Sequence, residues 1–271
     1  MILIVASKKD VAAMNIAQEI LDHYKFEKTS EAFQENPVYL KSFKGREFKL
    51  VFVNEDSVYA QFITEFFNPE LLIFVSRHSS SSGIPTLSVH TPGNIGKAEL
   101  GGLPRKVSVA AASVMKDALL EMAKLREEAE LDYQVSYECT HHGPSLDVPA
   151  MFIEVGSSLE QWKDLKAAEV VAHAAMVAAS TKAKYPAVLG IGGPHYNAKF
   201  TGIALNTQTA FSHIIPKYVI SNLDSEIVKH CVEKTVEEVK TAILEWKGIK
   251  GADKGNLTTI LRDIDLSIEK V

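Results

Sequence analysis

Histidine is the residue type of this chain whose positions most clearly suggest chemistry. Five of its nine histidines stand at or just beyond the ends of short apolar runs: His78, His90, His141, His142 and His195. An imidazole transfers protons near neutral pH, and its neutral form is a common metal ligand. A lone loop histidine is more often an ordinary surface or hydrogen-bonding residue. Five in corresponding positions favour convergence on one pocket.

Carboxylates accompany the histidines in the second half of the chain. If a strand over 133–140 continues to residue 142, Glu138 and His142 share one of its faces. Cys139 and His141 then share the other face. A carboxylate and an imidazole on one face can ligate zinc or act as an acid–base pair. A simple salt bridge of Glu138 is an equally good interpretation.

Two further carboxylates lie close by in the sequence. Asp147 follows the His-Gly-Pro turn that His142 begins. Glu154 lies inside the apolar run 150–155, and a carboxylate in such a run needs a partner. Asp147 is therefore a candidate for the same site.

Apolar patterning predicts the elements that position these residues. Short apolar or alternating runs predict strands at 2–6, 38–43, 46–53, 71–76, 85–90, 133–140, 150–155, 187–191 and 211–215. Apolar residues three and four apart predict helices at 10–24, 57–66, 107–130, 159–182, 224–246 and 256–269. Strands alternating with long helices indicate an α/β fold.

The expected architecture explains why the histidines stand where they do. We expect a mixed, mostly parallel sheet flanked by helices, in a single domain over residues 1–271, with the hairpin 38–53 supplying the antiparallel pairing. In open sheets of this class, ligands bind beyond the carboxyl ends of the strands. Those ends carry the histidines.

Several familiar catalytic motifs are absent. The chain has no H-E-x-x-H, no P-loop and no G-x-S-x-G elbow, which argues against zincins, P-loop nucleotide hydrolases and serine hydrolases. The glycines at 190–193 follow a strand but do not match the dinucleotide fingerprint, so a nicotinamide cofactor is not expected.

Composition indicates an ordinary globular protein without a global basic field. The net charge is −5, so contact with an anionic polymer requires a local patch. We expect Lys97, Arg105 and Lys106 to form it, and a second candidate cluster is Lys182, Lys184 and Lys199. The two cysteines are far apart and form no C-x-x-C pair, which argues against a thiolate zinc finger. With no signal sequence or spanning segment visible, we expect a cytoplasmic protein.

Five stretches of the chain together resemble one known family, the archaeal/plant-type D-aminoacyl-tRNA deacylases. They are Ser76-Arg77-His78-Ser79-Ser80, His90-Thr91-Pro92-Gly93-Asn94, Thr140-His141-His142-Gly143-Pro144, Phe152-Ile153-Glu154-Val155-Gly156-Ser157 with Trp162, and Gly192-Gly193-Pro194-His195-Tyr196. Their order and spacing fit over essentially the whole chain.

This resemblance implies several properties at once. The fold would be phosphorylase/hydrolase-like and similar to bacterial peptidyl-tRNA hydrolase. The activity would be zinc-dependent hydrolysis of the ester between a D-amino acid, such as D-tyrosine, and tRNA, with release of both. The partner would be D-aminoacyl-tRNA, with no membrane or DNA partner, and we expect a monomer. A peptidyl-tRNA hydrolase-like activity is the alternative.

Loop placement then gives the expected roles. We predict His142 and His195 as catalytic residues, and a zinc ion held by ligands drawn from His78, His90, His141, Glu138 and Asp147. Phosphates would be bound by the basic patch at Lys97, Arg105 and Lys106. A non-catalytic RNA- or metal-binding module is the competing class, but it needs no histidine-lined pocket.

Overall fold

The larger of two principal sheets carries the site. The computed structural model describes residues 1–271 without a gap. Eight strands stand side by side in the order β2 (Glu27–Phe33), β3 (Asn36–Phe43), β4 (Arg46–Val53), β1 (Ile2–Ser7), β5 (Leu71–Arg77), β10 (Ala150–Gly156), β6 (Thr86–His90) and β9 (Gln134–Tyr137). The four central strands, β4, β1, β5 and β10, are mutually parallel, and β1, β5 and β10 are buried almost throughout.

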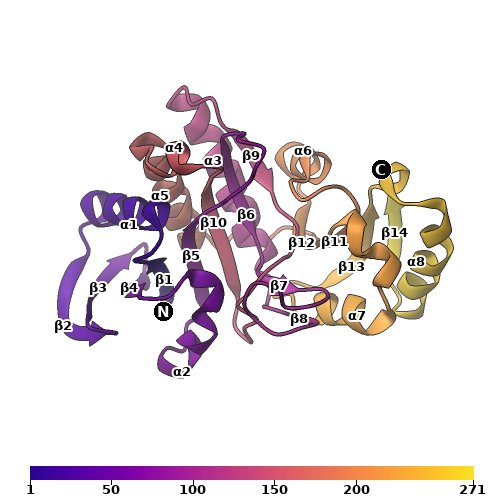
Figure 1. Ribbon diagram of the computed structural model, residues 1–271, viewed down its shortest axis with the longest axis horizontal. Helices are drawn as coiled ribbons and strands as arrows, with labels where there is room; N and C mark the ends of the chain where they lie inside the picture. Colours follow the sequence, from indigo (N-terminus) through magenta and orange to yellow (C-terminus); the bar gives the residue numbers. More distant parts are fainter.

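The smaller sheet is built from the C-terminal third of the chain. Its four parallel strands are β12 (Ala210–Ile215), β11 (Ala187–Ile191), β13 (Val239–Leu244) and β14 (Ser267–Lys270). It lies beyond the β9 edge of the larger sheet (Figure 1). A short ribbon of β7 (Gly93–Asn94) and β8 (Lys106–Val107) lies between the two.

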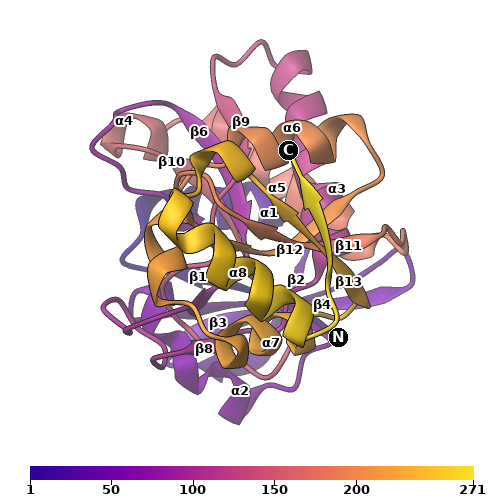
Figure 2. The same cartoon turned by 90° about the vertical axis from the view of Figure 1, so that its right-hand side faces the viewer.

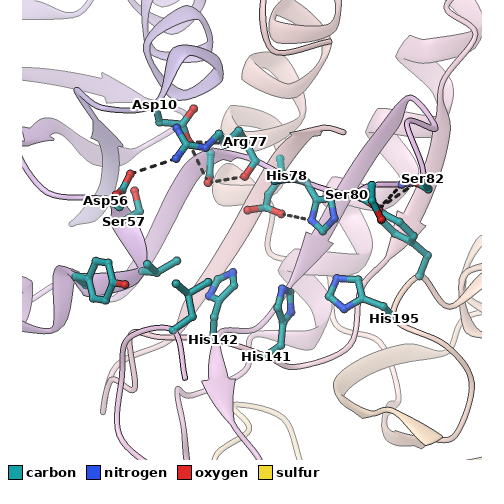
Figure 3. Close-up of a pocket in the computed structure, with 18 residues that line it drawn as sticks. Asp10, Asp56, Ser57, Arg77, His78, Ser80, Ser82, His141, His142 and His195 are labelled. Atoms are coloured by element: carbon teal, nitrogen blue, oxygen red, sulfur yellow. Dashed lines mark hydrogen bonds and ion pairs between the residues drawn. The ribbon is translucent and has the colours of Figure 1, made fainter. Parts of the chain in front are cut away.

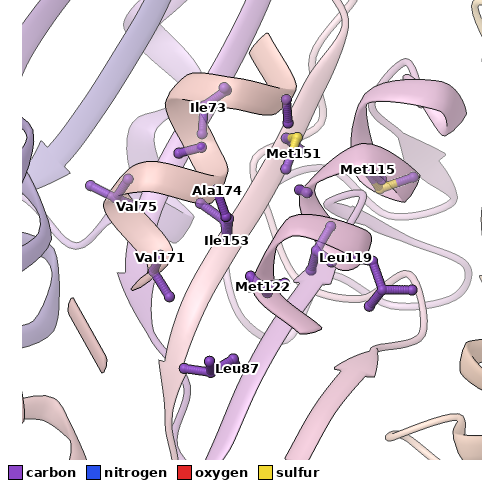
Figure 4. Packing of buried hydrophobic residues seen from close by; sticks show 14 of the residues in the cluster. Ile73, Val75, Leu87, Met115, Leu119, Met122, Met151, Ile153, Val171 and Ala174 are labelled. Carbon is purple, nitrogen blue, oxygen red and sulfur yellow. The ribbon is translucent and has the colours of Figure 1, made fainter. Parts of the chain in front are cut away.

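Three long helices cover one face of the larger sheet: α1 (Val11–Tyr24), α3 (Ala112–Glu128) and α5 (Leu165–Ser180). Asp10 and Asp164 cap α1 and α5, each accepting backbone N–H bonds of the first turn. Figure 4 shows Val171 and Ala174 of α5 against Ile73 and Ile153 of the sheet. This packing holds β5 and β10 rigidly, and both strands end at the site.

Shorter helices complete the layers. The opposite face of the larger sheet packs against the 3₁₀ segment η1 (Ser57–Phe62) and α2 (Ile63–Phe66). Figure 2 shows α7 (Ser225–Glu233) and α8 (Gly251–Asp263) against the smaller sheet. The others are α4 (Leu159–Trp162), α6 (Ala198–Asn206), η2 (Lys217–Asn222) and η3 (Trp246–Gly248). No helix has the length and apolar character needed to cross a membrane.

The expected fold class is confirmed, with corrections. The mixed, mostly parallel sheet flanked by helices is present, but the strands divide between two sheets instead of one. The helix expected at 224–246 is wrong beyond Glu233, because residues 239–244 form β13. The helix expected at 107–130 begins at Ala112, and the one at 159–182 is interrupted between Trp162 and Leu165.

A buried histidine joins the smaller sheet to the loop after β9. His213 Nε2 lies 3.0 Å from the Lys234 carbonyl oxygen, which can only accept, so Nε2 carries the proton. Nδ1 therefore accepts from the Thr140 hydroxyl at 3.1 Å, and that hydroxyl in turn accepts from the Ile214 N–H. Burial lowers the pKa of His213 to about 4. The network requires a neutral imidazole.

This network predicts acid sensitivity. The folded-state pKa of about 4 lies below the ordinary value of 6.5, so the stabilisation is complete above pH 6.5 and is lost as the pH falls towards 4. Between pH 7.5 and 4.5 the free energy of unfolding of the wild type should fall by about 2.5 kcal/mol more than that of His213→Gln. Urea unfolding at both pH values measures the difference, and equal losses would contradict the prediction.

Candidate active site

The carboxyl ends of the strands converge on one cavity of about 680 Å³. Its lining includes His78 after β5, His141 and His142 after β9, and His195 after β11. Figure 3 shows these four imidazoles around the same hollow. His90, the last residue of β6, lies buried behind His141 and His142. The structure therefore brings all five predicted histidines together.

Three of these imidazoles form a tight group. The ring centroids of His90 and His141 are 4.4 Å apart, those of His141 and His142 are 4.2 Å apart, and those of His90 and His142 are 4.9 Å apart. Each offers one ring nitrogen to a set whose members all lie within 4.8 Å of one another. We call this set the histidine trio.

The backbone fixes which nitrogen two of the trio present. His141 Nδ1 lies 2.8 Å from the Cys139 carbonyl oxygen, and His142 Nδ1 lies 2.7 Å from the Gly143 carbonyl oxygen. A carbonyl only accepts, so each Nδ1 carries the proton and each Nε2 keeps a free lone pair. This is the tautomer of a histidine that binds a metal ion through Nε2.

The trio is kept uncharged. Burial, together with the neighbouring His142, lowers the pKa of His90 to about 3. Burial lowers the pKa of His142 to about 4, and burial with its two histidine neighbours holds the pKa of His141 well below the usual range. All three imidazoles are therefore in the ligand form at neutral pH.

His90 supplies a direct test of whether a metal ion fits here. Both of its ring nitrogens are buried, and neither has a hydrogen-bond partner within the protein. A buried polar group without a partner costs about 1–3 kcal/mol. A metal ion would bind one of these nitrogens, and three neutral imidazoles are a common donor set for catalytic zinc. The residues present therefore fit a zinc ion.

A fully buried carboxylate organises the other side of the cavity. Glu138 Oε2 lies 2.8 Å from His195 Nε2, and Glu138 Oε1 lies 3.0 Å from His78 Nδ1. Burial opposes the charge on Glu138, but hydrogen bonds from His195 and His78 outweigh it and hold the pKa of Glu138 well below its usual range. This carboxylate is charged at neutral pH.

The two histidines that face Glu138 are correspondingly charged. Burial acts to lower the pKa of His78, but Glu138 and Glu154 outweigh it and raise it to about 10. Burial acts in the same way on His195, whose contacts with Cys139 and Glu138 raise its pKa to about 10. Each imidazolium can therefore donate a proton or stabilise a developing negative charge.

Glu154 has the opposite character to Glu138. Its Oε2 lies 3.3 Å from His78 Nδ1 and 3.8 Å from His90 Nε2, and its side chain lines the cavity. Burial and the charge of nearby Glu138 raise the pKa of Glu154 to about 7. Two carboxyl groups whose pKa values are pushed apart are typical of an acid–base site.

The two histidines after β9 do not alternate between faces as expected. That expectation required the strand to continue to residue 142, but β9 ends at Tyr137. His142 adopts the left-handed backbone conformation, with φ of 42°. This conformation is uncommon outside glycine, although histidine, asparagine and aspartate adopt it more often than other residues. It turns His142 to the same side as His141, so both join the trio.

Other predicted residues lie apart from the cavity. The Asp147 side chain is 93% exposed and pairs with Lys234, so the structure does not bring it to the histidines. In the basic patch, Arg105 is paired with Asp224 at 2.9 Å and with Glu226 at 3.4 Å, which offsets its charge.

Three residues that line the cavity have no predicted role from the sequence: Glu154, Asp10 and Tyr196. The signal in the sequence that marks Glu154 is its place as a carboxylate within an apolar run. Asp10, the cap of α1, lines the cavity and accepts hydrogen bonds from the Arg77 N–H at 2.7 Å and the Ser76 hydroxyl at 3.3 Å. Tyr196, beside the predicted His195, also lines it.

The family model and the curated relatives assign one family. A family model described as D-aminoacyl-tRNA deacylase matches residues 65–269. Curated D-aminoacyl-tRNA deacylases from Pyrococcus furiosus and Methanosarcina mazei are 36% and 34% identical to the chain, each over 99% of it and over 99% and 92% of their own lengths. A crystal structure of a conserved protein of unknown function superposes with a TM-score of 0.89 at 30% identity, covering 100% of this chain and 95% of that one.

The geometry predicts which histidines depend on Glu138. In Glu138→Gln the amide keeps the shape but loses the charge, so the pKa values of His78 and His195 should each fall by about 1 to 3. In the matched variant Glu154→Gln, only His78 should respond, because Glu154 contacts His78 and not His195. Titration of the imidazole proton resonances by NMR measures both. An unchanged His195 in Glu138→Gln would contradict the assignment.

Proposed function

This chain belongs to the D-aminoacyl-tRNA deacylase family, and on that premise we propose that the histidine-lined cavity is its catalytic site. The family hydrolyses the ester bond between a D-amino acid and tRNA. The observation that carries the assignment of the site is the close placement of three neutral and two charged imidazoles around one cavity that also holds two buried carboxylates.

The histidine trio is the proposed zinc site. His90, His141 and His142 would hold the ion, since the tautomers of His141 and His142 leave Nε2 free and His90 has no other partner. A bound zinc ion lowers the pKa of its water to about 7 and polarises a carbonyl. His142, which we expected to be catalytic from its placement, is thus proposed as a ligand. His78 and Glu138, which we expected to be metal ligands, are instead proposed to act in the hydrolysis without binding the ion.

The remaining groups supply the proton transfers of ester hydrolysis. A water molecule adds to the ester carbonyl, and Glu154, with a pKa of about 7, accepts a proton from it. His195 is protonated at neutral pH and gives its proton to the ribose oxygen as the C–O bond breaks. Glu138 holds that imidazolium in place, and His78 lies where a positive charge can stabilise the oxyanion. The products are a free carboxylate and tRNA.

Four further features of the proposal do not depend on the geometry of the cavity. D-tyrosine among the amino acids accepted, a cytoplasmic location, a monomeric state and the absence of a DNA partner follow from the family resemblance and the composition. The likeness to peptidyl-tRNA hydrolase remains a prediction. For tRNA contact, Lys97 and Lys106 are the better candidates in the basic patch, because Arg105 already faces two carboxylates.

Alanine substitution of the histidines should separate two kinds of defect. His90→Ala, His141→Ala and His142→Ala should lose both zinc and activity, since each removes a ligand. His195→Ala should keep zinc and lose about 10²–10⁴-fold in kcat, the usual contribution of general acid–base catalysis. Zinc content by elemental analysis and single-turnover deacylation measure the two effects. A fully active enzyme that carries no metal after chelation would refute the zinc site.

The choice of substrate tests the function itself. Purified protein should hydrolyse D-tyrosyl-tRNA and largely spare L-tyrosyl-tRNA. The matched control is D-tyrosyl-tRNA with an acetylated amino group. A peptidyl-tRNA hydrolase-like enzyme would prefer the blocked substrate, whereas a D-aminoacyl-tRNA deacylase should prefer the free amine. Equal rates on the two enantiomers would exclude the proposed specificity.

A further inference from the structure

A second group of metal-binding side chains lies between α1 and α5, away from the catalytic cavity. Glu19 and His23 are four residues apart on α1, and Glu169 and His173 are four residues apart on α5. Residues at this spacing lie on one face of a helix. The two helices pack side by side on the same face of the larger sheet (Figure 1). Each therefore presents one carboxylate and one imidazole to the same place.

The distances among His23, Glu169 and His173 fit metal ligands better than they fit hydrogen bonds. His23 Nε2 lies 3.5 Å from Glu169 Oε1, and His173 Nε2 lies 3.7 Å from the same oxygen. Both exceed the normal N–H···O range of about 2.7–3.2 Å. Ligand atoms at 2.0–2.2 Å from a tetrahedral ion lie about 3.3–3.6 Å from one another. One oxygen and two nitrogens thus stand close to the required spacing.

Tyr24 contacts the imidazole of His173, and one of the two tautomers that this contact allows leaves His173 able to bind a metal ion. Its hydroxyl lies 2.8 Å from His173 Nδ1. Burial raises the pKa of Tyr24 to about 12, so the hydroxyl stays neutral and can accept from Nδ1–H. The tautomer that makes this bond leaves Nε2 free towards Glu169, which is the way a partner outside the ligand set orients a metal-bound histidine.

Solvent can reach the group. The side chains of His23, Glu169 and His173 are 41%, 45% and 30% exposed. Glu169 and His173 also line a separate hollow of about 370 Å³, which shares no residue with the catalytic cavity. An ion can therefore enter without passing the active site. Glu19, whose Oε2 is 3.2 Å from His23 Nε2, adds a second carboxylate that favours a dication.

We propose that His23, Glu169 and His173 bind a divalent transition-metal ion that pins α1 to α5. Two imidazoles and a carboxylate are a donor set that zinc accepts, with a water completing the tetrahedron. The ion would carry no part of the hydrolytic chemistry. The proposal is independent of the catalytic zinc site, because the two groups have no residue in common.

Metal stoichiometry tests this directly. Chelator-stripped protein is titrated with Zn²⁺ by calorimetry and with Co²⁺ by visible absorption, in the wild type and in the double variant His23→Ala/His173→Ala. The variant should bind one equivalent less than the wild type and deacylate at the same rate when Zn²⁺ is saturating. Unchanged stoichiometry would overturn the proposal, whatever the metal content of the catalytic site.

Matched variants test whether the loss of one metal equivalent is specific to this site. His230→Ala removes a histidine outside both groups and should leave the stoichiometry unchanged. Glu169→Gln keeps the side-chain shape and should also lose one equivalent, so the test survives if the double variant folds poorly. Tyr24→Phe should weaken this site by about 10–100-fold, the usual effect of removing such an orienting partner. Full affinity in both Glu169→Gln and Tyr24→Phe would refute the site.

Discussion

The geometry of the proposed catalytic cavity depends on one buried charge. Glu138 is removed from water, and the effective cost of burying an ion is several kcal/mol unless partners compensate it. Its partners come from both sheets, because His78 follows β5 of the larger sheet and His195 follows β11 of the smaller one. The carboxylate can stay buried only where these two loops meet. Together with the Cys139 N–H bond to the His195 carbonyl and the Thr140 N–H bond to the Ile214 carbonyl, it joins the two sheets at the cavity.

The same burial produces two kinds of histidine within one site. Beside Glu138, His78 and His195 keep a proton, whereas burial makes the trio of His90, His141 and His142 give theirs up. Ester hydrolysis needs both kinds, because an uncharged imidazole can bind a metal ion and a charged one can protonate the leaving oxygen. His195 and His78 lie 2.8 and 3.0 Å from Glu138, whereas His141 lies 3.7 Å from it, so close contact with one carboxylate separates these roles.

Sequence patterning predicted the elements but not this division. Apolar runs such as 71–76 are unambiguous because a strand buried on both faces needs them. The periodicity at 224–246 misled because its valines suit a helix and a strand alike, and a contact remote in sequence decides between them. The Glu237 carboxylate accepts the Ala112 and Ser113 N–H groups at 3.0 and 2.8 Å, capping α3. Pairing with β11 and β14 further stabilises β13 as a strand.

The loops of the site are positioned by bonds that no local pattern reveals. The Arg77 N–H donates to Asp10, the cap of α1, and Trp162 Nε1, at the end of α4, donates to the His78 carbonyl at 2.8 Å. These bonds bridge 67 and 84 residues of sequence. Because α1 holds the backbone immediately before His78, a shift of α1 along the sheet would displace that imidazole from Glu138. The packing of α1 on the sheet and the bond from Arg77 to its cap therefore together keep His78 beside Glu138.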